Sequence, residues 1–139
     1  MIALLLAASF KVSVLSVASN ADFERWLTGN FITRMRDAHR GPVKAGQVTM
    51  FPIVVHKTRP GAVLVADFQV RASDGRVVIN RPACCRASKE RVAGFYVLDP
   101  VPELTLMASD LEGLYTATAT VRDETGAERV ARERLVCTP

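Results

Sequence analysis

The stretch GLYTATATVRDETGAERV, residues 113–130, predicts a β-hairpin and indicates the fold class of the whole chain. From Tyr115 to Val121, apolar side chains alternate with threonines, so one face of the run is apolar and the other carries hydroxyl groups. This period of two is typical of a strand with one buried face. A turn at Gly126 then leads into a second alternating run at residues 127–137.

Similar runs recur along the chain, separated by glycine, proline and Asp-Gly turns. They predict further strands at residues 30–36, 47–57, 62–72, 76–81, 95–98 and 104–109. Pro52 predicts an edge position or a bulge in the second of these runs, because proline donates no hydrogen bond to a ladder. Pro82 is expected to end a strand, and residues 82–94 to form an irregular connection, since they show no clear period. Seven or eight strands of this kind predict an all-β protein, an antiparallel β-sandwich.

The composition fits one ordinary globular domain. The chain has 139 residues, of which 49% are hydrophobic and 23% charged, so it can bury a core and does not resemble a disordered chain.

Residues 1–21 are apolar, small and almost uncharged, and they predict a secretory signal peptide cleaved after Ala21. Cleavage would leave a single domain at residues 22–139 in a periplasmic or secreted location. Lys11 interrupts the apolar run, and no basic residue precedes it. An uncleaved N-terminal membrane anchor and a buried first strand or helix therefore remain as alternatives.

The segment DLEGLYTATATVRDETG, residues 110–126, resembles the immunoglobulin-like and fibronectin type III-like sandwich domains of bacterial envelope proteins. The resemblance implies that Tyr115 forms a tyrosine corner, with its hydroxyl bonded back to the preceding turn. Ala117 stands where an antibody-type domain has a core cysteine, so the characteristic inter-sheet disulfide of those domains is not expected. Because this architecture hosts many functions, the resemblance implies no particular ligand.

The chain has three cysteines, two of them adjacent. In an oxidising compartment Cys85, or alternatively Cys84, could bond Cys137, and closing this loop of about fifty residues would contribute roughly 4 kcal/mol. The third cysteine would be left over. Three reduced core cysteines and a functional thiol are the alternatives. A thioredoxin-like site is not expected, because the adjacent cysteines lack the two-residue spacer.

Other residue patterns point away from catalysis. His39 and His56 have no second ligand at a metal-motif interval, and the sequence contains no nucleophile elbow or glycine-rich phosphate loop. We therefore expect no enzymatic activity, no cofactor and no metal site.

The formal charge is +4, and basic residues predominate in residues 22–98. Arg71, Arg76, Arg81 and Arg86 form a candidate interaction surface for an envelope protein or another anionic surface. Nucleic acid is not expected, because no aromatic stripe accompanies the arginines. Membrane contact is expected only if the leader is uncleaved.

The sequence thus predicts a non-catalytic secreted or periplasmic module that acts through protein or surface interactions. The alternative is a sandwich that binds a small ligand or a metal at the Cys84–Cys85 loop.

Overall fold

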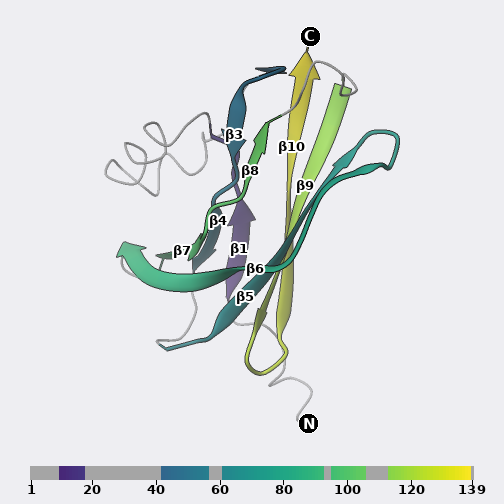
Figure 1. Cartoon of the computed structure of the whole chain (residues 1–139). Helices are drawn as coiled ribbons and strands as arrows, with labels where there is room; N and C mark the ends of the chain where they lie inside the picture. The colour runs from purple at the N-terminus through teal and green to yellow at the C-terminus, as the bar shows by residue number, and fades with distance from the viewer. Residues whose placement is uncertain (1–9, 18–41, 57–60, 93–94, 106–112, 139) are drawn as a thin grey trace.

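The computed structural model describes residues 10–17, 42–56, 61–92, 95–105 and 113–138. Within these residues, ten strands form an eight-stranded sheet of order β1-β4-β7-β6-β5-β9-β10-β2 and a two-stranded sheet of β3 and β8 (Figure 1). The strands are β1 Lys11–Val14, β2 Val43–Lys44, β3 Val48–Met50, β4 Ile53–His56, β5 Leu64–Ala72, β6 Val77–Val92, β7 Phe95–Asp99, β8 Glu103–Thr105, β9 Gly113–Asp123 and β10 Glu128–Thr138.

The all-β prediction is confirmed, but the arrangement of the strands differs from the predicted antiparallel sandwich of seven or eight strands. Strand β2 pairs parallel to β10 through Val43 and Lys44, so the large sheet is mixed. A two-residue strand is too short to show a period in the sequence, and the direction of its pairing leaves no local signal.

The long strands β5, β9 and β10 run side by side and form the most regular part of the sheet (Figure 1). Their alternation matches the sequence prediction, because apolar residues such as Phe68 and Ala119 are fully buried while their neighbours face outward. Phe68 packs against Phe51, with ring centroids 5.3 Å apart. The hairpin predicted at residues 113–130 is confirmed by the antiparallel ladder of β9 and β10.

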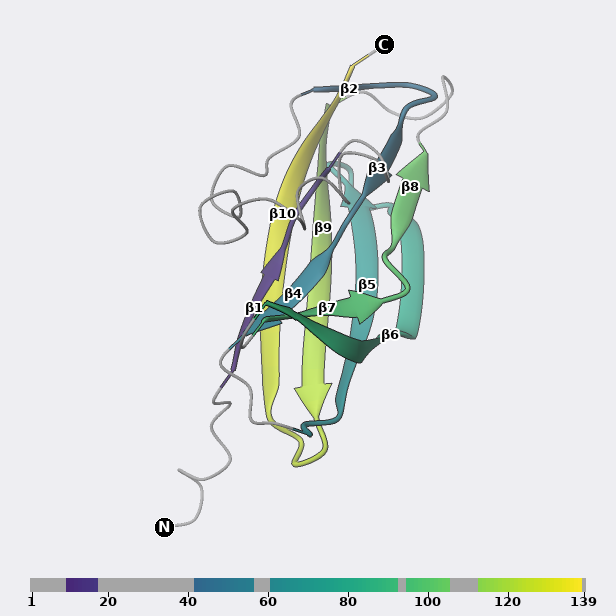
Figure 2. The same cartoon turned by 90° about the vertical axis from the view of Figure 1, so that its left-hand side faces the viewer.

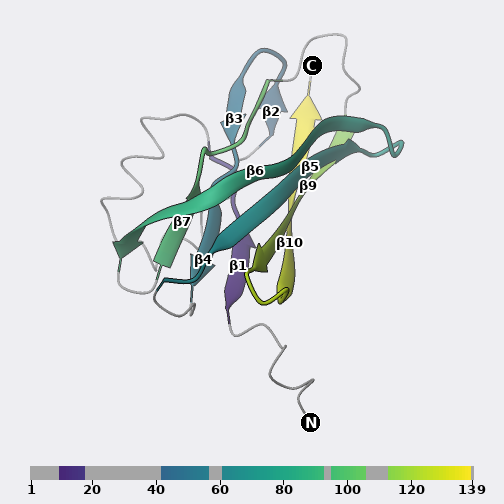
Figure 3. The same cartoon turned by 60° about the horizontal axis from the view of Figure 1, so that its bottom comes forward.

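The large sheet curls so that β1 and β4 lie opposite β9 and β10 (Figure 2). Strand β6 makes this possible by changing partners along its length. It pairs with β5 from Val77 to Arg86 and with β7 from Arg86 to Val92, and it crosses the molecule obliquely (Figure 3). One layer thus contains β1, β4 and β7, and the other contains β5, β9 and β10. A strand that passes from one layer to the other, as β6 does, forms a corner between them.

Both strand-breaking prolines behave differently from the sequence prediction. Pro52 separates β3 from β4, which belong to different sheets, instead of lying inside one edge strand. Pro82 does not end β6, which continues to Val92, so the predicted irregular connection is wrong for most of its length. The missing N–H group of Pro82 falls between the paired residues Arg81 and Cys85, where the ladder needs no donor.

Strand β1 lies within the segment predicted to be a signal peptide. Phe10, Val14 and Leu15 are buried, and Ser16 donates a hydrogen bond of 3.3 Å from its hydroxyl to the buried carboxylate of Glu133 on β10. Cleavage after Ala21 would remove these contacts, and the domain boundary at this residue stays a prediction.

The strand predicted at residues 30–36 lies outside the described residues. Within the described part of the chain, no helix is long and apolar enough to span a membrane.

Substitution of Ser16 by alanine tests the contact between the two layers. We expect Ser16→Ala to lower the free energy of unfolding by about 1–2 kcal/mol, because the buried carboxylate of Glu133 loses a donor. Ser13→Ala is the matched control, since Ser13 lies on the same sheet edge but is only half-buried. Urea unfolding followed by circular dichroism measures both variants, and an equal loss in the two would contradict the prediction.

Candidate functional site

The corner in β6 contains a bulge. Ala66 and Phe68 of β5, two positions apart, pair with Cys85 and Arg81 of β6, which are four positions apart. The extra residues lie at the sequence Pro-Ala-Cys, and Ala83 adopts a left-handed backbone conformation with φ of 48°. Few residues other than glycine adopt this conformation, so Ala83 must be held in it by its surroundings.

Asp67 holds the bulge from the outer side of the sheet. The backbone N–H of Ala83 donates a hydrogen bond of 2.7 Å to the Asp67 carboxylate, which also receives two hydrogen bonds from Arg122 of β9, at 2.7 and 3.2 Å. The Arg122 guanidinium first, and the Ala83 amide second, hold the pKa of the Asp67 carboxyl below its ordinary value. The same carboxylate raises the pKa of Arg122. A single side chain thus links β5, β6 and β9.

A disulfide joins Cys84 to Cys85 at the bulge, and Cys137 is buried and takes part in no disulfide among the described residues. The predicted bond from Cys85 or Cys84 to Cys137 is therefore wrong for this structure. Ladder register places Cys85 level with Arg129 of β10, three strands away. Cys137 lies eight positions further along β10, a displacement of roughly 27 Å. This is far beyond the ~7 Å between Cα atoms that a disulfide can bridge.

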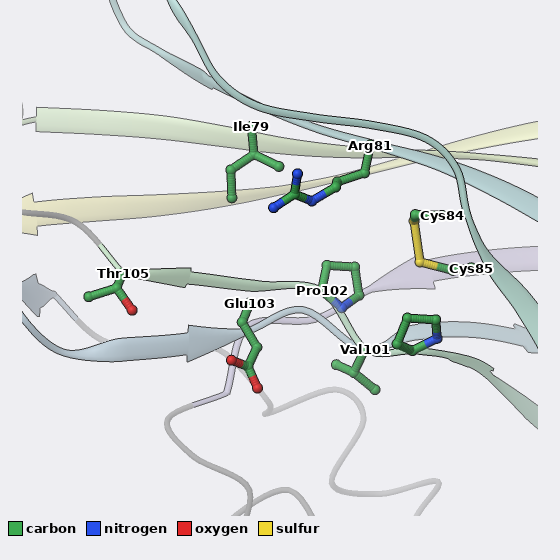
Figure 4. Close-up of a pocket in the computed structure, with 9 residues that line it drawn as sticks. Ile79, Arg81, Cys84, Cys85, Val101, Pro102, Glu103 and Thr105 are labelled. Carbon is green, nitrogen blue, oxygen red and sulfur yellow. A yellow bond between two sulfur atoms is a disulfide. The ribbon is translucent and has the colours of Figure 1, made fainter.

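The disulfide forms one wall of an open pocket of about 430 Å³ (Figure 4). The pocket lies between β6 and the segment that runs from the end of β7 into β8. Its lining residues are Ile79, Arg81, Cys84, Cys85, Pro100, Val101, Pro102, Glu103 and Thr105. The pocket thus combines an apolar wall with one cation, one carboxylate and one hydroxyl group.

This chemistry suits a small molecule with an apolar body and a few polar groups. Arg81 and Glu103 both line the pocket and carry opposite charges. No cluster of three or more His, Cys, Asp or Glu residues suitable for a metal ion occurs in the part of the chain that the structure describes.

The structure does not bring the four predicted surface arginines together. Arg71 and Arg86 point away from the core. Their ladder partners are Val77 and Val65, and paired residues of neighbouring strands point to the same side of a sheet. Arg76 lies in the turn between β5 and β6, where its N–H donates to the carboxylate of Asp74. Arg81 pairs with the inward-facing Phe68 and lines the pocket on the opposite side of the sheet.

Two other arginines extend the outer face. Arg132 and Arg134 are exposed on β10, and the register aligns Arg134 with Arg71 through Thr116 of β9. Within the described residues, no carboxylate lies within 4.0 Å of the side-chain nitrogens of these arginines or of Arg86. Both arginines belong to the alternating run predicted at residues 127–137, but the sequence pattern could not show that they lie beside residues more than sixty positions earlier.

Apolar side chains accompany these arginines. Leu114, Val130 and Val136 are each between 40 and 45% exposed on β9 and β10. On the same face, Val130 and Val136 flank the two arginines of β10, and Leu114 precedes the threonines of β9. We call the outward-facing residues of β5, β9 and β10, together with Arg86, the outer face.

Tyr115, the predicted tyrosine corner, is buried near the start of β9. The turn that precedes Gly113 lies outside the described residues, so the predicted hydrogen bond of the hydroxyl stays a prediction.

Comparisons with known proteins give a fold and no family. No protein-family model and no curated protein matches the sequence. The CARDB domain of a Pyrococcus furiosus protein, solved in complex with di-metal ions, aligns over 93% of this chain and 87% of its own, with 14% identity and a TM-score of 0.45. The alkylpurine DNA glycosylase AlkC of Pseudomonas fluorescens, solved bound to DNA containing an abasic site analog, aligns over 98% of this chain with 12% identity and a TM-score of 0.52. This chain covers 32% of that enzyme, and the similarity shows a shared fold alone.

The pH dependence of stability tests the role of Asp67. Because the pKa of Asp67 is lowered in the folded state, its ionised form stabilises the protein above the unfolded pKa, near pH 4, and this contribution is lost as the pH falls through the folded pKa. We expect Asp67→Asn to cost up to about 1 kcal/mol at pH 7, since both side chains of the pair are more than a third exposed. This difference should shrink in acid.

Urea unfolding at a series of pH values from 7 downward measures the effect. Glu128→Gln, which removes an exposed carboxylate from the same side of the sheet, is the control and should show a smaller difference at pH 7. A difference between Asp67→Asn and the wild-type protein that does not change with pH would contradict the assignment.

Proposed function

We propose that the chain is a non-catalytic, exported domain of immunoglobulin-like type that binds an acidic protein surface through the outer face. The observation that supports this proposal is the group of four exposed arginines, Arg71, Arg86, Arg132 and Arg134, with no carboxylate in ion-pair distance among the described residues. Arg122 is largely neutralised by Asp67, so the four arginines give this face its positive charge.

The mixture of arginine and aliphatic side chains favours a protein partner. Protein interfaces combine an apolar centre with charged groups that steer association, and arginine is enriched in them. Val130 and Val136 offer apolar area on either side of Arg132 and Arg134 along β10, and Leu114 lies beside Val136. A polysaccharide or a phosphate backbone would use the arginines but would gain little from these aliphatic side chains. An acidic protein surface would use both.

Strand β10 is suited to such contacts. Among the described residues, only Cys137 and Thr138 of β10 are paired on the side away from β9, through β2. Charged outward-facing residues on such a strand oppose its pairing with another copy of the chain. The same residues are available to a partner that approaches the outer face.

Charge reversal on β10 tests the proposal. We expect the double variant Arg132→Glu and Arg134→Glu to lose an acidic protein that the wild-type domain captures from an envelope extract. With that protein purified, the dissociation constant should rise about tenfold or more, which corresponds to roughly 1.4 kcal/mol. Binding by the wild-type domain should weaken as salt is added.

Arg76→Glu is the matched control, since this arginine lies in a turn outside the aligned rows of the outer face. Equal binding by the double variant would contradict the proposal. Binding of the wild-type domain to anionic phospholipid vesicles or to an anionic polysaccharide, without binding to the captured protein, would also contradict it.

The pocket supports a second candidate function, the binding of a small ligand. Its size and its combination of an apolar wall with Arg81, Glu103 and Thr105 are the observations that favour this function. The ligand would be a compact molecule with an apolar body and at least one polar group that can bond to the guanidinium.

A fragment library screened by ligand-detected NMR tests this candidate. Fragments that bind the pocket should lose about tenfold in affinity with Arg81→Ala, because a charged hydrogen bond contributes on the order of 1.5 kcal/mol or more. They should bind Arg86→Ala unchanged, since Arg86 lies on the other side of the sheet. Fragments that bind both variants equally would show that the pocket is not their site.

A further inference from the structure

We propose that the Cys84–Cys85 disulfide is redox-active and is opened by thiol–disulfide exchange with a small dithiol that enters the pocket. This inference goes beyond the proposed binding function and does not depend on it. It rests on the position of the disulfide in the pocket wall and on the backbone geometry of the bulge.

The first observation is access. Both cysteines line the open pocket, and Cys84 is only partly buried (Figure 4). A structural disulfide in a protein core is shielded from attack, whereas exposed disulfides are the labile ones. The pocket is large enough to admit a small thiol compound to the sulfur of Cys84.

The second observation is the conflict between the disulfide and the strand. Adjacent residues of a regular strand point to opposite faces of the sheet, but a bond between their sulfur atoms requires both side chains to lie together. In β6 the bulge and the left-handed conformation of Ala83 accommodate this arrangement. Reduction would remove the requirement and allow Cys84 to return to ordinary alternation.

The third observation is a positive charge in the same pocket as the disulfide, on the Arg81 side chain, whose guanidinium points toward Ile79 (Figure 4). The guanidinium of Arg81 lines this pocket and is a cation. Thiol–disulfide exchange releases a thiolate, and a neighbouring cation stabilises this leaving group. Arg81 is therefore a positioning residue whose charge favours reduction.

The reduction takes place in two thiol–disulfide exchange steps. A thiolate of the dithiol attacks the sulfur of Cys84, a mixed disulfide forms, and the electron pair of the broken bond leaves on Cys85. The second thiol of the reductant then loses its proton and attacks the mixed disulfide at the sulfur atom that belongs to the reductant. This attack releases Cys84 as a thiolate. The dithiol is oxidised to a disulfide by two electrons, and the two cysteines take up two protons to become thiols.

Reduction of the disulfide should also change the structure of the outer face. The Ala83 N–H donates to Asp67, and Asp67 binds Arg122 of β9. A change in the bulge thus reaches β9 through a single carboxylate. We expect the backbone amide signals of Ala83 and Arg122 to shift together when the disulfide is reduced.

Native-state reduction in dithiothreitol, with iodoacetamide trapping and intact-mass detection, tests the proposal. We expect the folded wild-type protein to gain two alkyl groups, at Cys84 and Cys85, while buried Cys137 stays unmodified. Arg81→Ala should slow the reaction several-fold. Arg86→Ala, which removes the same charge from the opposite side of the sheet, should leave the rate unchanged.

A further variant separates local reaction from global unfolding. Ser16 does not line the pocket, and Ser16→Ala lowers global stability, so a reaction that requires unfolding should accelerate about five- to thirtyfold for a loss of 1–2 kcal/mol. If the disulfide is reduced in the folded protein, Ser16→Ala should not accelerate its reduction. Reduction that accelerates in this way, that fails in the folded protein, or that proceeds equally fast with Arg81→Ala would overturn the proposal.

Discussion

Strand β6 has to pair with two neighbours that belong to opposite layers, and this requirement governs the rest of the structure. The extra residues between Arg81 and Cys85 allow the strand to bend while both ladders stay paired. A bulge removes a backbone N–H from the ladder, and here Asp67 accepts the hydrogen bond of Ala83. The curl of the sheet, the pocket inside the corner and the position of the outer face all depend on this bend.

The sequence predicts the strands that have one face in water and one in the core. Strands β5, β9 and β10 are of this kind, and their alternation identified which side chains are buried. Strand β6 beyond Pro82 could not be predicted, because its bulge destroys the period. The apolar character of residues 1–21 is ambiguous for a physical reason: a secretory leader and a strand that covers a core, such as β1, need the same kind of side chains.

The candidate sites were only partly predictable, because strand alternation and sheet order decide which residues meet. Arg81 and Arg86 are close in sequence but lie on opposite sides of the sheet. Arg71 and Arg134 are distant in sequence but align across β9. The cysteine pairing could not be predicted without the register of four strands, because only that register shows how far Cys137 lies from the corner in β6.

The contact between Ser16 and Glu133 joins residues 117 positions apart, and this separation bears on how the chain folds. Contacts between distant residues form slowly, because the entropy of a large loop is lost before the contact stabilises it. During synthesis β1 emerges more than a hundred residues before β10. The contacts between β1 and β10 therefore cannot form until all the strands between them have been synthesised.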